Sequence, residues 1–226
     1  MRRALRSLST VLIVSGSLML ADAALTLLWQ EPVSGLYAKI VQGRLNTDLQ
    51  KLQKQKTSPL DLAALRKLAT EKLRIAFEAR KLRGELKPGE AAGRITIAKI
   101  KVNYVVVDGT DTAALRKGPG IYEQVPFPGA PGTTAIAGHR TTWLAPFRRI
   151  NELRRGDKIV VQMPYARLTY AVEMTRIVPP TELSVIHRVS HDRLVLSACH
   201  PLYSAAKRFI VFAKLVSEQA LGAARI

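Results

Sequence analysis

The chain has 226 residues, of which 47% are hydrophobic and 23% charged, a balance typical of a folded protein with one sizeable domain and an appendage. Its formal net charge of +18 suits nucleic acid, an anionic membrane or an anionic wall polymer. The sequence contains no helix-turn-helix, zinc-finger or aromatic and basic motif, which argues against nucleic acid. One cysteine, Cys199, excludes an internal disulfide.

The chain opens with a basic segment followed by an apolar run. Residues 1–7 carry three arginines, and residues 8–29 are apolar apart from small polar residues and Asp22. At about 1.5 Å per residue, this run is long enough to cross a bilayer of about 30 Å. A cleaved signal peptide is the alternative, because Ala21-Asp22-Ala23 resembles a cleavage site. Apolar sequence continues to Trp29, so we expect an uncleaved single-pass anchor in the cell membrane, a cytoplasmic tail over 1–7 and an extracellular domain.

Residues 30–89 have the periodicity of helices. Leucines recur at three- to four-residue spacing on both sides of residues 56–59, and Ser58-Pro59 followed by an aspartate is typical of a helix start. We expect two helices, with a break near 56–59 and an end near Gly84. This helical linker is either a stalk or docking helix over the domain, or a solvated spacer.

From residue 90 onward the pattern changes to short strands. Turns rich in glycine and proline separate apolar runs over residues 94–97, 102–107, 134–137, 158–162, 168–178, 193–198 and 208–216. We expect only short helices between them, at 112–117 and 146–153. Seven or eight short strands with minor helix predict a closed all-β barrel or a sandwich over residues 90–226.

Cys199 ends one of these strands, because Pro201 cannot continue a ladder. Arg208 opens the next strand, so a hairpin-like return brings its guanidinium alongside the sulfur. A lone cysteine in an apolar run is ordinarily a small core residue, and an arginine on a strand is ordinarily a surface charge. Their placement instead indicates a thiol nucleophile with a cation that can stabilise an oxyanion.

A thiol nucleophile also needs a base, and the chain has four histidines. His200 adjoins the cysteine but faces the other side of an extended strand, whereas His187 and His191 lie in the polar segment before that strand. His139 ends its own apolar strand, so the strand ends of a barrel can bring it to Cys199. No Asp or Glu flanks this histidine, which favours a Cys-His-Arg arrangement. We find no zinc or calcium pattern, and we expect no metal and no cofactor.

Four segments, in order, resemble the sortase family, the membrane-anchored cysteine transpeptidases of Gram-positive bacteria. They are the basic and apolar N-terminus, Gly118-Pro119-Gly120-Ile121-Tyr122, Ala135-Ile136-Ala137-Gly138-His139-Arg140-Thr141, and Leu196-Ser197-Ala198-Cys199 through Arg208. The resemblance covers roughly residues 90–216. The His-Arg-Thr and Cys-His-Pro sequences look most like class E, which is found in high-GC actinobacteria.

The resemblance implies a closed eight-stranded β-barrel with short helices, preceded by a transmembrane helix and a helical stalk. It places His139, Cys199 and Arg208 on the catalytic positions of the family. Tyr122 falls near a tyrosine that helps to shape the substrate pocket. Ala198 replaces a threonine that the family commonly has beside the nucleophile, and this difference implies altered substrate recognition.

The activity that the resemblance implies is transpeptidation. Cys199 attacks the carbonyl between Thr and Gly of an LPxTG- or LAxTG-like sorting signal, and His139 protonates the leaving amine. An amine of a cell-wall precursor or of a pilin then attacks the thioester. The expected partners are secreted proteins with C-terminal sorting signals and this acceptor. Two alternatives stay open, a non-catalytic membrane-anchored scaffold that binds the cell wall and a hydrolytic cysteine protease.

Overall fold

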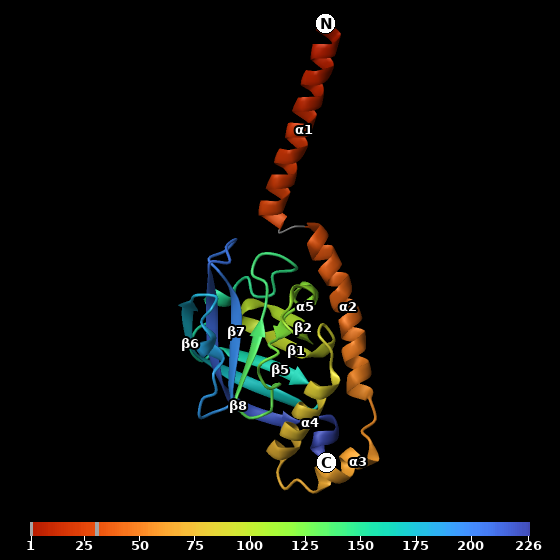
Figure 1. Ribbon diagram of the computed structural model, residues 1–226, viewed down its shortest axis with the longest axis vertical. Coiled ribbons are helices and arrows are strands. Elements are labelled where there is room, and N and C mark those ends of the chain that lie inside the picture. Colours follow the sequence, from red (N-terminus) through yellow and green to blue (C-terminus); the bar gives the residue numbers. More distant parts are fainter. Residues whose placement is uncertain (1, 30–31) are drawn as a thin grey trace.

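The computed structural model describes residues 2–29 and 32–226, and its strands close into an eight-stranded barrel (Figure 1). The strands are β1 (Ala91–Ile97), β2 (Val102–Asp108), β3 (Gly120–Ile121), β4 (Thr133–Ala137), β5 (Lys158–Met163), β6 (Ala166–Val178), β7 (Arg193–His200) and β8 (Lys207–Ala220). Their order around the barrel is β1-β2-β3-β4-β7-β8-β6-β5, and β5 pairs with β1. The predicted closed all-β barrel is therefore confirmed, and the sandwich is excluded.

Apolar side chains that alternate along the strands fill the barrel. Removing one such side chain from water stabilises the fold by about 1.5–3 kcal/mol. The large side chains that are buried in the barrel core include Phe127, Phe147, Ile95, Ile97, Ile121, Ile136, Ile159 and Met163. This core fixes the positions of β4, β7 and β8, which are neighbours in the barrel.

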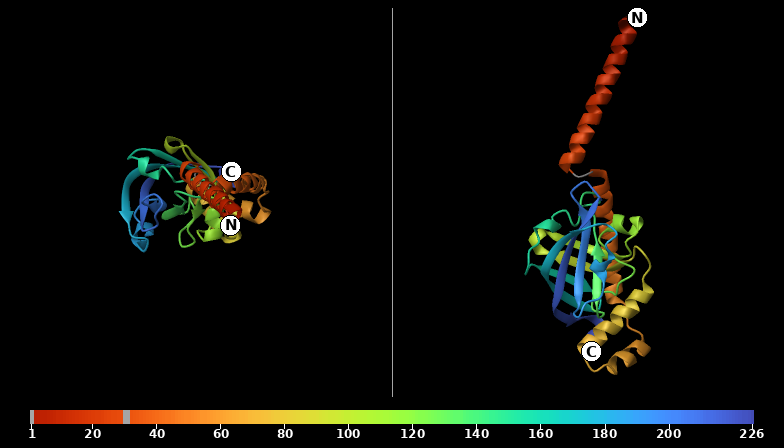
Figure 2. Two further views of the ribbon diagram at one scale, coloured as in Figure 1. Left: turned by 90° about the horizontal axis from the view of Figure 1, so that it is seen from above. Right: turned by 60° about the vertical axis from the view of Figure 1, so that its left-hand side comes forward.

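Five α-helices complete the described chain: α1 (Arg2–Trp29), α2 (Pro32–Lys54), α3 (Pro59–Arg66), α4 (Glu71–Glu85) and α5 (Thr112–Lys117). Within α1, residues Leu5–Ala24 are long and apolar enough to cross a membrane, and none of that stretch is buried in the protein. Figures 1 and 2 show α1 projecting away from the barrel.

Two of the helix predictions need correction. The break near 56–59 is confirmed, because the Ser58 hydroxyl accepts a hydrogen bond from the Asp61 amide at 3.1 Å and starts α3. The predicted second helix, however, is two helices, because Thr70 caps the start of α4 and accepts from the Leu73 amide at 3.3 Å. Leucine spacing continues across residues 67–70 and conceals this break. The helix predicted at 146–153 is reduced to the 3₁₀ turn Ile150–Glu152.

Helix α2 is docked on the barrel and is not a solvated spacer. The side-chain amide of Gln42 donates to the carbonyls of Val105 (3.1 Å) and Lys117 (2.8 Å) and accepts from the Val105 amide (2.8 Å). It thus takes the place of a neighbouring strand along β2. Leu45 and Leu49 of α2 are buried in a cluster with apolar residues of β1 and β2. These contacts hold the helix along one side of the barrel.

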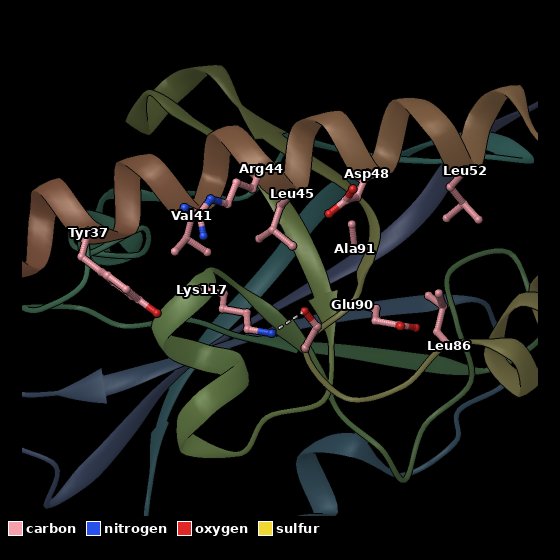
Figure 3. A pocket seen from close by; sticks show the side chains of 11 residues that line it. Tyr37, Val41, Arg44, Leu45, Asp48, Leu52, Leu86, Glu90, Ala91 and Lys117 are labelled. Atoms are coloured by element: carbon pink, nitrogen blue, oxygen red, sulfur yellow. Dashed lines mark hydrogen bonds between the residues drawn. The ribbon is translucent and has the colours of Figure 1, made fainter.

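A groove of about 460 Å³ remains between α2 and the barrel (Figure 3). Tyr37, Val41 and Leu45 line its α2 side, and Glu90 and Lys117 lie opposite. The Lys117 ammonium closes part of the opposite wall by donating to the Gly89 carbonyl at 3.1 Å. None of the residues predicted to carry chemistry lines this groove.

Candidate active site

Two of the predicted catalytic residues lie on the neighbouring strands β7 and β8, and the third, His139, follows the end of β4, which pairs with β7. Cys199 of β7 is the register partner of Arg208 in antiparallel β8. The parallel pairing of β4 with β7 ends at the pair Ala137 and Ser197, and continuing it by two residues on each chain leads to His139 and Cys199. Adjacent strands are about 4.8 Å apart, and residues two apart share a face. From this geometry we infer that the three residues form one row, which we call the catalytic row.

The surroundings of His139 favour a neutral imidazole. Partial burial lowers the pKa of this histidine, and the nearby Arg116 guanidinium lowers it further. Its Nε2 atom is buried and has no hydrogen-bond partner in the part of the chain that the structure describes. A neutral imidazole with an unpaired nitrogen can accept a proton, which is the property that a general base needs.

Close packing fixes the backbone on which His139 stands. Its carbonyl accepts a hydrogen bond from the Phe147 amide at 3.0 Å. A Cβ atom added to Gly138 would lie 2.6 Å from the Phe147 ring, so a larger residue cannot enter without moving the ring or the end of β4. Gly138 also donates its amide to the Ser197 carbonyl at 3.0 Å, which continues the pairing with β7.

Cys199 is a free, partly exposed thiol at the end of β7. Opposite it, the Arg208 Nη1 atom donates to the carbonyls of Ala205 (2.9 Å) and Lys207 (3.1 Å), which holds the guanidinium against the loop between β7 and β8. Arginine has five N–H donors in a rigid fork, so this anchoring leaves other donors for a ligand. A thiol, a neutral base and a fixed cation on one face can carry out acyl transfer.

Arg140 belongs to this site, although we did not predict it from the sequence. Its side chain is 4% exposed. Its Nη1 atom donates to the Cys199 carbonyl at 3.3 Å and lies 3.1 Å from His200 Nδ1, and its Nη2 atom donates to Asn151 Oδ1 at 2.8 Å. Arg140 thus ties the end of β7 to the segment that follows His139. An arginine after a strand is ordinarily a surface charge, so its position in the sequence gave no signal of this role.

The structure does not bring Tyr122 to the catalytic row. Its amide donates to the Ala135 carbonyl at 3.0 Å, four residues before His139 and therefore about 13 Å away along the strand. Tyr122 instead lines a cavity of about 430 Å³ together with apolar residues that include Leu183 and Ile186.

Ala198 lies in the barrel core, 3% exposed, on the strand face opposite to that of Cys199. A role of Tyr122 or Ala198 in substrate binding therefore stays a prediction.

The remaining histidines make other contacts. His191 Nε2 lies 3.4 Å from Glu173 Oε2, and His200 faces Arg140. Across residues 2–29 and 32–226, apart from the side chains that the structure does not describe, no group of three His, Cys, Asp or Glu side chains is arranged to hold a metal ion.

Comparison with known proteins identifies relatives of this barrel. The Sortase domain family model matches residues 95–216. Sortase D of Bacillus subtilis (strain 168) is 35% identical over 134 residues, which are 57% of this chain and 66% of that protein. The structure of sortase E from Streptomyces avermitilis matches 60% of this chain and 93% of its own, with a TM-score of 0.55 and 31% identity.

A third match extends beyond the barrel. The structure of a Clostridium perfringens sortase D5 transpeptidase covers 78% of this chain and 99% of its own, with a TM-score of 0.63 and 23% identity, a likeness that concerns the fold alone. The chain aligns with 43% to 66% of the length of its curated relatives. Relatives named sortase D and sortase E both occur among these matches, so class E stays a prediction.

Proposed function

Because the chain belongs to the sortase family, we propose that it is a membrane-anchored cysteine transpeptidase that joins proteins with a C-terminal sorting signal to an amine. Two observations support this proposal: the register that pairs Cys199 with Arg208, and the parallel pairing of β4 with β7, whose continuation leads His139 toward Cys199. We assign these three residues the roles of nucleophile, oxyanion stabiliser and general acid and base.

The first half of the reaction forms a thioester. The Cys199 thiol gives its proton to His139, and the sulfur attacks the carbonyl carbon of the Thr–Gly bond of an LPxTG- or LAxTG-like signal. The negative charge that develops on the carbonyl oxygen is stabilised by the N–H donors of Arg208. The C–N bond then breaks, and the imidazolium returns the proton to the leaving glycine amine.

The second half transfers the acyl group. An amine of a cell-wall precursor or of a pilin attacks the thioester carbon, and His139 takes the proton of that amine. The C–S bond breaks, and the sulfur of Cys199 recovers a proton from the imidazolium. One amide bond is exchanged for another, and no water is consumed. The depressed pKa of His139 favours this cycle, because the imidazole starts in the neutral form.

The cavity beside Tyr122 is suited to the first residue of the sorting signal. It lies about 13 Å along β4 from His139, and an extended peptide covers that distance in about four residues. Four residues separate the start of an LPxTG or LAxTG signal from the bond that is cleaved. Leu183 and Ile186 give this cavity apolar walls that match a leucine side chain. Ala198, which is buried, would influence the substrate only through the position of Cys199.

We further propose that α1 anchors the enzyme in the cell membrane. The basic residues before Leu5–Ala24 favour a cytoplasmic N-terminus and an extracellular barrel. In this arrangement residues 1–7 form the tail, 8–29 the anchor, 30–89 the helical linker and 90–226 the catalytic domain. Anchoring the enzyme and its substrates to one membrane raises their effective concentration.

The test uses the full-length protein in detergent with fluorogenic LAxTG and LPxTG peptides and a triglycine amine. Mass spectrometry of the products is expected to show a ligated peptide that is lost in Cys199→Ala and His139→Ala, whereas His191→Ala, a histidine that contacts Glu173 and lines neither the row nor the Tyr122 cavity, keeps activity. Cleavage without ligation would support the protease alternative. A folded wild-type protein that neither cleaves nor ligates either peptide would support the scaffold alternative.

A further inference from the structure

Two loops that flank the catalytic row lie near the junction of α1 and α2. They are residues 139–149, which follow β4, and residues 201–206, which connect β7 to β8; together we call them the rim loops. Figures 1 and 2 show both loops at the end of the barrel nearest to α1, and the tip of 201–206 almost level with the start of α2. The apolar helix therefore leaves the molecule on the side where the catalytic row opens.

Side-chain contacts fix the rim loops to that end of α2. The ring of Tyr37, in the second turn of α2, packs edge-on against the Trp143 ring with 5.8 Å between their centroids. Tyr37 is five residues beyond Pro32, or about 7.5 Å along the helix axis. Arg148 Nη2 donates to the Tyr203 hydroxyl at 3.1 Å and thereby links the two rim loops. The position of the loops thus follows that of the linker next to the membrane span.

The chain between the span and these contacts is short. The apolar span ends at Ala24, thirteen residues before Tyr37, and apolar sequence continues as far as Trp29. The helical residues described between Ala24 and Tyr37, 25–29 and 32–37, extend only about 7.5 Å and 9 Å along their helix axes, and the headgroup layer of a bilayer occupies several ångströms of that length. Because the tip of 201–206 reaches almost to the start of α2, it is held near the headgroup layer.

The composition of the rim matches such a surface. Residues 139–149 contain three arginines, Lys207 and Arg208 at the start of β8 adjoin the second loop, and neither rim loop contains Asp or Glu. At the tip, Leu202 is 39% and Tyr203 63% exposed, and a positive φ of 64° at Tyr203 gives the loop a sharp turn there. Exposed apolar and aromatic side chains beside cations are typical of surfaces that lie at a membrane interface, where anionic lipids attract the cations.

We propose that the rim loops rest in the headgroup layer of the membrane that α1 crosses, with Leu202 and Tyr203 inserted and with the adjacent, exposed Lys207 bound to the phosphates of anionic lipids. This inference rests on the membrane anchoring proposed above. It orients the catalytic row toward the bilayer, so that a sorting signal whose own tail lies in that leaflet meets Cys199 at the membrane surface.

The experiment measures how close a tryptophan at the loop tip comes to lipid. The chain has two tryptophans, Trp29 and Trp143. Both are replaced by phenylalanine in the full-length protein, and Leu202→Trp then provides a single reporter. The matched control is Leu60→Trp in the same background, because Leu60 is 80% exposed on α3, at the end of the molecule far from α1 (Figure 1). Each protein is reconstituted in phosphatidylcholine vesicles with phosphatidylglycerol, made with or without bromine on the upper acyl chain.

We expect brominated lipid to reduce the emission of the Leu202→Trp protein about twofold and to leave that of the Leu60→Trp protein nearly unchanged. The quenching should weaken in Lys207→Glu, in vesicles without phosphatidylglycerol and at high salt. Equal quenching of the two reporters overturns the proposal. Quenching that responds to neither the charge of residue 207 nor the anionic lipid overturns the role assigned to the cations.

Two further measurements distinguish a failure of the membrane contact from a failure of the proposed function. A protein that keeps Trp29 and carries Trp143→Phe reports on the anchor itself, and an unquenched Trp29 overturns both the anchor and the membrane contact. Peptide ligation by the same vesicles tests the catalytic proposal independently. An enzyme that ligates peptides while the Leu202→Trp reporter stays unquenched overturns the membrane contact alone.

Discussion

Replacing Arg140 by glutamine tests whether this buried side chain positions the nucleophile. The substitution removes a hydrogen bond to the Cys199 carbonyl, one to Asn151 and the contact with His200. A hydrogen bond to a charged group contributes about 1.5–3 kcal/mol, and buried acceptors left without a donor add to the loss. We expect the free energy of unfolding to fall by about 3–5 kcal/mol. For a domain of this size, that corresponds to a melting temperature lower by roughly 6–20 °C.

The effect on catalysis is expected to exceed the effect of unfolding. Below the melting temperature of the variant, kcat should fall about 100-fold with KM nearly unchanged, because a misplaced sulfur loses its alignment with the carbonyl while peptide binding at the Tyr122 cavity continues. Arg140→Lys keeps the charge but lacks the planar fork, so we expect it to recover stability more than kcat. A folded Arg140→Gln protein with the kcat of the wild type would refute the positioning role. A variant with unchanged melting temperature would refute the hydrogen-bond reasoning itself.

Three other substitutions test neighbouring parts of the argument. Arg116→Gln removes a cation that lowers the pKa of His139, so this pKa should rise and the acidic limb of the pH profile of kcat/KM should move to higher pH. A profile that does not move would show that burial alone sets the pKa of His139. Gly138→Ala places a Cβ atom 2.6 Å from the Phe147 ring, so the free energy of unfolding should fall by about 1–3 kcal/mol and the activity should also fall. An unchanged melting temperature would mean that the ring moves freely. Gln42→Ala removes three hydrogen bonds between α2 and the barrel, so the rate of amide hydrogen exchange along β2 should rise by at least about tenfold. An unchanged exchange rate would argue against docking of α2 through the Gln42 amide.

Much of the fold could be predicted because its signals are local. The apolar run at the N-terminus, the change from helical to strand periodicity near residue 90, and the glycine and proline turns each involve neighbouring residues only. The same holds for the pairing of Cys199 with Arg208, since a short loop joins their strands and a hairpin fixes which residues face each other. The start of α3 at Ser58 was likewise readable from three adjacent residue types.

Other features depend on segments that are far apart in the sequence. The parallel pairing of β4 with β7 joins residues sixty positions apart, and its continuation beyond Ala137 and Ser197 leads to His139 and Cys199. Sequence spacing alone carries no information about such a register, and the pair was indicated only by the position of both residues at strand ends and by the resemblance to a family. The docking of α2 through Gln42, the distance of Tyr122 from the row and the core position of Ala198 were set in the same way, by packing between distant elements.

Arg140 illustrates the difference most clearly. From the sequence it is one of 35 basic residues, and although it lies in a segment that resembles the family, nothing there assigns it a role. Its role arises only when the closing of the barrel buries it against the carbonyl of Cys199, Asn151 and His200. The sequence by itself therefore determined which reactive groups this protein has and most of its strands, with the short strand β3 missed. The tertiary structure decided which side chains hold those groups in place, because a buried charge is stable only where distant residues supply its partners.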